Sequence, residues 1–197
     1  MAGKQAKVLT EAQARSVVRH LKEESRYADR NVVIFYLSYL AGLRASEISK
    51  IPWEMVLGAD GRVQKFIELR DSISKKGAGR IIPMHSDLQS ALIDWRSNPR
   101  MVWRERTETV ILSMRNAPMS PHSIVLWFKR LYSTLGIEGA SSHSGRRTLA
   151  TRSARNLSKV GGSLKDLQSI LGHKNVSTTQ LYVDVSSEAK RKLIDSL

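Results

Sequence analysis

A histidine and a tyrosine stand nine residues apart near the end of the chain, as His173 and Tyr182. An imidazole can move a proton and a phenol can act as a nucleophile, so the pair is suited to chemistry at a phosphate. Gly172 follows the apolar positions of 164–171, which is typical of a helix C-terminus and would place the histidine in a turn. A structural alternative stays open, in which His173 caps a helix and Tyr182 packs in a core.

Two arginines upstream could supply the positive charge that phosphate chemistry requires. Arg44 follows a glycine in the stretch 41–48, and Arg146 lies in the stretch 142–148, 27 residues before His173. A guanidinium can bind two non-bridging phosphate oxygens at once, which a lysine ammonium cannot do. The structural alternatives are a cation at a helix C-terminus for Arg44 and a surface charge for Arg146.

These stretches, taken in chain order, resemble the catalytic domain of tyrosine recombinases, the phage integrase family. The family's pattern is an arginine, a lysine on a hairpin, His-x-x-Arg, a histidine or tryptophan, and the nucleophilic tyrosine. The resemblance covers residues 10–185, and the ordered set is much more specific than any one fragment. The matching residues are Arg44, Lys75, His143, Arg146, His173 and Tyr182.

The resemblance implies a role for each of these residues in breaking a DNA strand. Tyr182 would attack the scissile phosphate and form a 3′-phosphotyrosine, which conserves the energy of the broken bond, so that ATP is unnecessary. His143 would be the general base, and His173 would donate a hydrogen bond to a phosphate oxygen. Lys75 would protonate the leaving 5′ oxygen, with Lys76 as an alternative because hairpin lengths vary. The family chemistry implies no cofactor and no metal.

Elementary chemistry explains why these residue types are needed. A phosphodiester repels nucleophiles, and the charge on its oxygens grows along the reaction, so fixed cations stabilise the transition state. A tyrosine hydroxyl has a pKa of about 10, but adjacent arginines favour the phenolate and a histidine can accept its proton. The chain contains no cysteine, which excludes disulfides, thiolate metal sites and cysteine nucleophiles.

The charge balance predicts a polyanionic partner. Lysine and arginine total 32 against 18 acidic residues, for a net charge of +14. A solubilising surface is the alternative, but double-stranded DNA is the partner that the resemblance implies. No apolar run approaches the roughly 18 residues of a membrane span, and the basic N-terminus lacks the apolar region of a signal peptide. We therefore expect a cytoplasmic, DNA-associated protein.

Local patterns predict a mainly helical domain with a small antiparallel sheet, an α+β fold that the resemblance also implies. Residues 32–40 are apolar nearly all round and predict a central buried helix that ends at Gly42. Strands are predicted at 63–69 and 80–83, with a third at 110–112. The residues predicted to cap the helices are Thr10 with Gln13, Ser46, Ser86, Ser120 before Pro121, Ser144, Ser163 with Asp166, and Ser187.

The expected organisation is a basic tail at 1–9, a catalytic domain at 10–186 and a C-terminal helix at 187–197. One face of that helix is apolar, through Ala189, Leu193, Ile194 and Leu197. The pattern alone allows this face to dock on its own domain or on a neighbour. Members of the family pass a C-terminal segment to the next protomer, so the resemblance implies docking in trans, with a monomer in solution and a homotetramer on synapsed DNA.

The function that the resemblance implies is site-specific recombination that integrates, excises or inverts a mobile or phage-like element, with accessory DNA-bending proteins as further partners. The alternatives are a type IB topoisomerase and a DNA-binding regulator that kept the fold. Gly145 and Arg147 depart from the leucine and histidine that the family more often carries. Most members also have a separate helical domain before the catalytic one; here such a domain is either naturally absent or trimmed.

Overall fold

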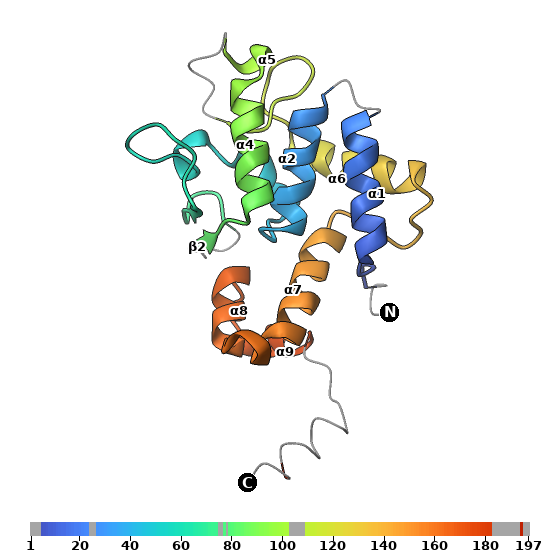
Figure 1. The fold of residues 1–197 in the computed structure, drawn as a ribbon, viewed down its shortest axis with the longest axis vertical. Coiled ribbons are helices and arrows are strands. Elements are labelled where there is room, and N and C mark those ends of the chain that lie inside the picture. Colours follow the sequence, from blue (N-terminus) through green and yellow to red (C-terminus); the bar gives the residue numbers. More distant parts are fainter. Residues whose placement is uncertain are drawn as a thin grey trace.

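The structure is a computed structural model that describes residues 5–23, 27–74, 77, 79–102, 109–182 and 194. Within these residues, helices pack around one another and a two-stranded sheet lies at one side (Figure 1). The elements are α1 (Glu11–Glu23), α2 (Ala28–Tyr39), α3 (Ala45–Lys50), η1 (Trp53–Met55), β1 (Phe66–Leu69), β2 (Arg80–Pro83), α4 (Ser86–Ser97), α5 (Pro99–Val102), α6 (Pro121–Thr134), α7 (Ser144–Asn156), η2 (Ser158–Val160), α8 (Leu164–Leu171) and α9 (Val176–Gln180).

Helix α2 is the central buried helix that its apolar run predicted. It packs against α1, α4 and α7, and Val33, Ile34 and Phe35 are completely buried. A helix covered on several sides requires apolar residues around most of its circumference, which explains the continuous run. The chain leaves this helix through Gly42, whose φ of +67° lies in the left-handed region that favours glycine.

The predicted hairpin is present, with a shorter first strand than expected. Strands β1 and β2 pair antiparallel, with Phe66 opposite Pro83 and Leu69 opposite Arg80. Val63, which we expected in the strand, instead makes an isolated bridge to Leu57. The hairpin base therefore begins closer to the basic turn than the apolar pattern suggested.

The prediction of a third strand at 110–112 is wrong. Leu112 makes only a single bridge to Pro118, and the segment is buried core that forms no strand. Side chains bind its carbonyls: the Trp95 indole donates to the Val110 oxygen at 2.8 Å, and Arg30 donates to the Leu112 oxygen at 2.9 Å. A buried apolar run whose carbonyls are partly satisfied by side chains has the same composition as a strand, so periodicity could not separate the two.

Of the predicted caps that lie in the described residues, three are observed and three are not. Thr10 with Gln13 exchange the backbone and side-chain hydrogen bonds of a capping box, Ser163 with Asp166 do the same, and the Ser120 side chain caps α6. Each of the misassigned caps is a helical residue, since the helix begins at or before it; these are Ser46, Ser86 and Ser144. At α4 the acceptor is instead the imidazole of His85, which binds the Asp87 amide at 3.1 Å.

Helix α7 joins the main body to a smaller cluster formed with α8 and α9 (Figure 1). Ala150, Leu167 and Leu171 form a small apolar core there, and Tyr182 packs against it. Helix α8 also contacts β2, so the hairpin and the C-terminal cluster lie together.

The segment before α1 packs on the domain. The Lys7 amide donates to the Gly139 oxygen, and the buried Leu9 donates its amide to the Thr148 hydroxyl at 2.8 Å. The helix predicted at 187–197 lies outside the described residues, except for Ile194. Among the described helices, none is both long and apolar enough to cross a bilayer.

Candidate active site

Arg146 lies in the first turn of α7. Its side chain is buried, and both of its terminal nitrogens donate hydrogen bonds. Its Nη1 donates to the Gly42 oxygen and its Nη2 to the Leu171 oxygen, each at 2.5 Å. Gly42 has positive φ, and Leu171 directly precedes Gly172, which also has positive φ, so both acceptors lie where a helix ends. The guanidinium is thereby fixed between the end of α2 and the end of α8.

The surroundings of Arg146 are electropositive and poorly hydrated. Burial, together with the charges of Arg44 and Arg80, lowers the pKa of Arg146 to about 9, although Glu47 and Tyr182 oppose the shift. A guanidinium with this pKa still carries its charge at neutral pH. The site thus holds a concentrated positive potential that an anion would relieve.

Arg44 stands at the start of α3 with its guanidinium partly exposed. Its Nη1 donates to Glu47 Oε1 at 3.0 Å, and its amide donates to Glu47 Oε2 at 2.8 Å. The Arg44 side chain is 21% exposed, whereas that of Glu47 is fully buried. One end of this ion pair is therefore rigidly supported while the other remains open to a ligand.

Arg80 is a site residue that we did not predict. It is buried on β2, donates to both oxygens of Glu47 at 3.1 Å and donates from Nε to the Ile170 oxygen at 2.8 Å. Burial raises the pKa of Glu47, but the hydrogen bonds and charges of Arg80 and Arg44 outweigh it and lower the pKa below its ordinary value. A charged residue that shares the inward strand face with Ile82 was the available signal in the sequence.

His173 and Tyr182 lie beside each other, as their spacing suggested. Their rings are nearly parallel, at 14°, with centroids 6.1 Å apart. The His173 Nδ1 lies 2.9 Å from the hydroxyl of Thr179, another residue that sequence reasoning missed. Burial, with the charges of Arg146, Arg44 and Arg80, lowers the pKa of His173 to about 4, so its imidazole is neutral at neutral pH.

A cavity of about 360 Å³ brings three predicted residues together: it is lined by His143, Arg146 and Tyr182. His143 is exposed at the N-terminus of α7, and its Nδ1 lies 3.5 Å from the Ser142 hydroxyl. Arg147 lines the same cavity and donates to the Ala6 oxygen at 2.8 Å. The segment before α1 therefore forms part of the cavity wall.

Lys75 and Lys76 lie outside the described residues. The structure describes the base of the hairpin that carries them. Arg80 follows the turn and reaches Glu47, while the Gly79 amide donates to Asp71 at 2.6 Å. The hairpin base is thus connected to the arginines, and the lysines remain predictions from the sequence.

Close helix packing accounts for glycine at position 145. A Cβ added to Gly145 would lie 2.4 Å from Ser38 Oγ and 3.0 Å from the Ser38 backbone carbon. A leucine at this position would require α7 to move away from α2. The departure from the family's usual residue is therefore a packing feature beneath Arg146.

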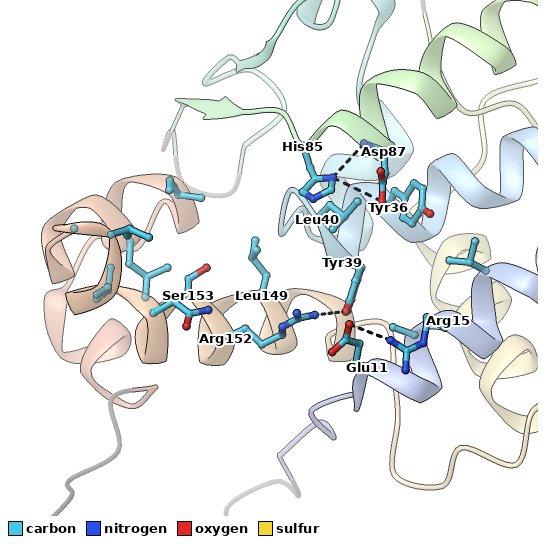
Figure 2. Close-up of a pocket in the computed structure, with 18 of the residues that line it drawn as sticks. Glu11, Arg15, Tyr36, Tyr39, Leu40, His85, Asp87, Leu149, Arg152 and Ser153 are labelled. Carbon is cyan, nitrogen blue, oxygen red and sulfur yellow. Dashed lines mark hydrogen bonds and ion pairs between the residues drawn. The ribbon is translucent and has the colours of Figure 1, made fainter. Parts of the chain in front are cut away.

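A second cavity, of about 970 Å³, is larger but lies elsewhere (Figure 2). Residues from α1, α2, α7 and α8 line it, and in Figure 2 Arg152 donates to the Tyr39 hydroxyl beside the Glu11–Arg15 ion pair. Of the predicted site residues that the structure describes, none lines this cavity. Its walls are mostly apolar, so volume alone would have pointed away from the residues suited to phosphate chemistry.

Comparisons with known proteins agree with the predicted family. The model of the phage integrase family matches residues 7–189. A tyrosine recombinase XerC from Rhizobium meliloti (strain 1021) is 31% identical over 194 residues, which cover 96% of this chain and 57% of the relative. A tyrosine recombinase XerD from Staphylococcus saprophyticus is 29% identical over 177 residues, covering 88% of this chain and 56% of the relative. The chain thus spans little more than half the length of these relatives.

Solved structures confirm the predicted fold. The Tn1549 transposon integrase in complex with a circular intermediate DNA has a TM-score of 0.76 and 22% identity, covering 100% of this chain and 67% of that one. The XerA recombinase has a TM-score of 0.71 and 24% identity, covering 96% of this chain and 64% of that one. At these identities the similarity establishes a shared architecture.

Proposed function

The chain belongs to the phage integrase family, and on that premise we propose that it cleaves and rejoins double-stranded DNA at specific sites through a 3′-phosphotyrosine. The observation that carries the proposal is the convergence of four residues from separate segments. Arg44 and Arg146 lie at the starts of α3 and α7, while His173 and Tyr182 flank α9. Besides burial, the charges of Arg44 and Tyr182 affect the pKa of Arg146, and those of the two arginines lower the pKa of His173. The rings of His173 and Tyr182 lie side by side.

The arginines would neutralise the scissile phosphate as its charge grows. A guanidinium has five N–H donors, and the two carbonyl bonds of Arg146 leave others to bind a phosphate oxygen. Arg44 offers the partly exposed end of its ion pair. Because both groups are held before substrate arrives, little reorganisation accompanies the reaction.

The covalent step begins at Tyr182. Its hydroxyl oxygen forms a bond to phosphorus, its proton passes to His143 in the shared cavity, and the bond from phosphorus to the 5′ oxygen breaks. Lys75, or Lys76, gives a proton to the leaving 5′ oxygen. Rejoining reverses these steps, with a 5′ hydroxyl from the same or another strand attacking the phosphotyrosine.

DNA is the proposed partner, and the basic excess supports it through phosphate contacts and counterion release. Residues 10–186 would be the catalytic domain. The protein would be monomeric in solution and tetrameric on synapsed DNA, with accessory DNA-bending proteins assisting. The relatives named as recombinases favour strand exchange over topoisomerase-like relaxation.

A nicked suicide substrate tests the chemistry directly, because loss of a short fragment traps the covalent intermediate. Candidate duplexes from the flanking genome are incubated with the protein, and the adduct is digested and sequenced by mass spectrometry. We expect a DNA-linked peptide that contains Tyr182, no adduct from Tyr182→Phe, and normal adduct from Tyr36→Phe, which lies in the larger cavity. A linked peptide without Tyr182 would refute the proposal.

A further inference from the structure

Thr179 contacts both partners of the His173–Tyr182 pair. The residue is completely buried in α9, and its hydroxyl lies 2.9 Å from His173 Nδ1. Its backbone oxygen accepts the Tyr182 amide hydrogen at 3.1 Å. A single residue therefore holds the histidine through its side chain and the tyrosine through its backbone.

The hydrogen bond to Nδ1 decides which nitrogen of His173 carries the proton. A neutral imidazole has one N–H, and its position follows from the bond that the other nitrogen makes. Burial and the charges of Arg146, Arg44 and Arg80 disfavour a second proton on this ring. If the Thr179 hydroxyl donates to Nδ1, the proton of the ring is on Nε2.

We propose that Thr179 is a positioning residue, whose hydroxyl donates to His173 Nδ1 and so fixes the tautomer that can donate from Nε2 to a phosphate oxygen. The benefit of that tautomer rests on the function proposed above for His173. The hydrogen bond itself belongs to the free protein and is present without DNA. The Thr179 carbonyl adds a second constraint, because it ties Tyr182 to the same helical turn.

Packing alone would not require a hydroxyl at this position. Valine has nearly the shape of threonine and would fill the same buried site, so a residue needed only for packing would tolerate it. Serine keeps the hydroxyl and loses a methyl group. The two substitutions therefore separate hydrogen bonding from packing, and Thr178, an exposed neighbour in the same helix, provides the matched control.

The first test measures the tautomer in the free protein. Imidazole ¹⁵N shifts are recorded at neutral pH for the wild type, Thr179→Val, Thr179→Ser and Thr178→Val, with the His173 signals assigned by their loss in His173→Asn. We expect the Nε2–H form in the wild type, Thr179→Ser and Thr178→Val, and a substantial fraction of the Nδ1–H form in Thr179→Val. An unchanged Nε2–H form in Thr179→Val would overturn the inference.

The second test measures cleavage of the suicide substrate by the same proteins. Thr179→Val should slow adduct formation by about 10- to 100-fold, the range found when a hydrogen-bond partner that orients a metal-bound histidine is removed, while Thr179→Ser and Thr178→Val stay near the wild type. Thr179→Ala removes the same donor without new volume and replaces the valine variant if that one misfolds. A tautomer shift with unchanged cleavage would refute the positioning role.

The two tests also separate this inference from the proposed function. If the wild type forms no adduct on any DNA tested, the proposed strand cleavage is refuted, but the ¹⁵N shifts still decide whether Thr179 sets the tautomer. If the wild type cleaves and the tautomer is unaffected by Thr179→Val, the proposed function is supported and the inference about Thr179 is refuted.

Discussion

Arg80 on β2 and Glu47 on α3 form a two-point ion pair in the interior, with both nitrogen–oxygen distances at 3.1 Å. The same carboxylate accepts from Arg44, and the third nitrogen of Arg80, Nε, donates to the Ile170 oxygen in α8. The pair therefore joins the hairpin, the first arginine and the helix that leads to His173. Removing one partner of a buried pair leaves an uncompensated charge, which makes this connection testable.

Glu47→Gln should lower the free energy of unfolding at pH 7 by on the order of 3 kcal/mol, because Arg80 and Arg44 lose their carboxylate. The pKa of Glu47 is lower in the folded protein than its ordinary 4.5. The stabilisation is thus complete above that value and is lost as the pH falls through the folded pKa. Urea unfolding followed by tryptophan fluorescence should show the gap between the two proteins closing in acid. A gap independent of pH would contradict the ion-pair explanation.

Gly172→Ala should be more damaging than Gly161→Ala, although both glycines have positive φ, +60° and +66°. The left-handed conformation costs either alanine about 1–2 kcal/mol. An added Cβ at position 161 meets nothing within 4 Å, whereas at position 172 it lies 2.9 Å from Arg80 Cδ. We expect thermal melts to show the larger loss for Gly172→Ala and the suicide substrate to show slower cleavage in that variant alone. Equal losses would mean that Arg80 adapts freely.

Arg146→Ala should reduce single-turnover cleavage by roughly 10²–10³-fold, the usual cost of deleting a donor that stabilises transition-state charge. DNA binding in a gel-shift assay should change little, since the chain carries many other cations that would contact phosphates. Arg152→Ala is the control, because it removes one charge from the same helix in the wall of the other cavity. Cleavage at the control's rate by Arg146→Ala would refute the assignment.

Lys75→Ala should also block cleavage, and a 5′-phosphorothiolate substrate should restore it. Sulfur is a good leaving group without protonation, so the substrate replaces a general acid but cannot replace an arginine that binds phosphate. Rescue is measured as adduct formed with sulfur relative to oxygen. Rescue of Lys76→Ala instead would assign the acid to the neighbouring lysine.

Deletion of 187–197 should spare cleavage of one half-site but abolish recombination between two full sites. The segment is predicted to be a short helix with an apolar face formed by Ala189, Leu193, Ile194 and Leu197. A helix this short is marginal alone, so this face must dock on a partner surface. Half-site cleavage and recombination between two labelled duplexes are compared for the same preparation. Full recombination by the shortened chain would show that the segment is not exchanged between protomers.

The sequence by itself determined the order of the residues proposed to bind phosphate and to act as the nucleophile, the central buried helix and the hairpin. These features are local. Apolar periodicity selects a helix, and a glycine after the apolar run marks its end, as Gly42 and Gly172 do with their positive φ. Prediction failed where a local pattern is compatible with two tertiary structures, as in 110–112, where the Val110 and Leu112 carbonyls accept from the side chains of Trp95 and Arg30 instead of from a neighbouring strand.

Only the tertiary structure decided which charges and hydroxyls support the site. Arg80 and Glu47 are 33 residues apart, and Arg146 is held by carbonyls of Gly42, 104 residues away, and Leu171, 25 residues away. Thr179 is buried while the adjacent Thr178 is exposed. Apart from the position of Arg80 on the inward face of its strand, no local rule distinguishes these residues from ordinary surface ones, because a buried polar group becomes stable only when folding brings its hydrogen-bond partner from another part of the chain.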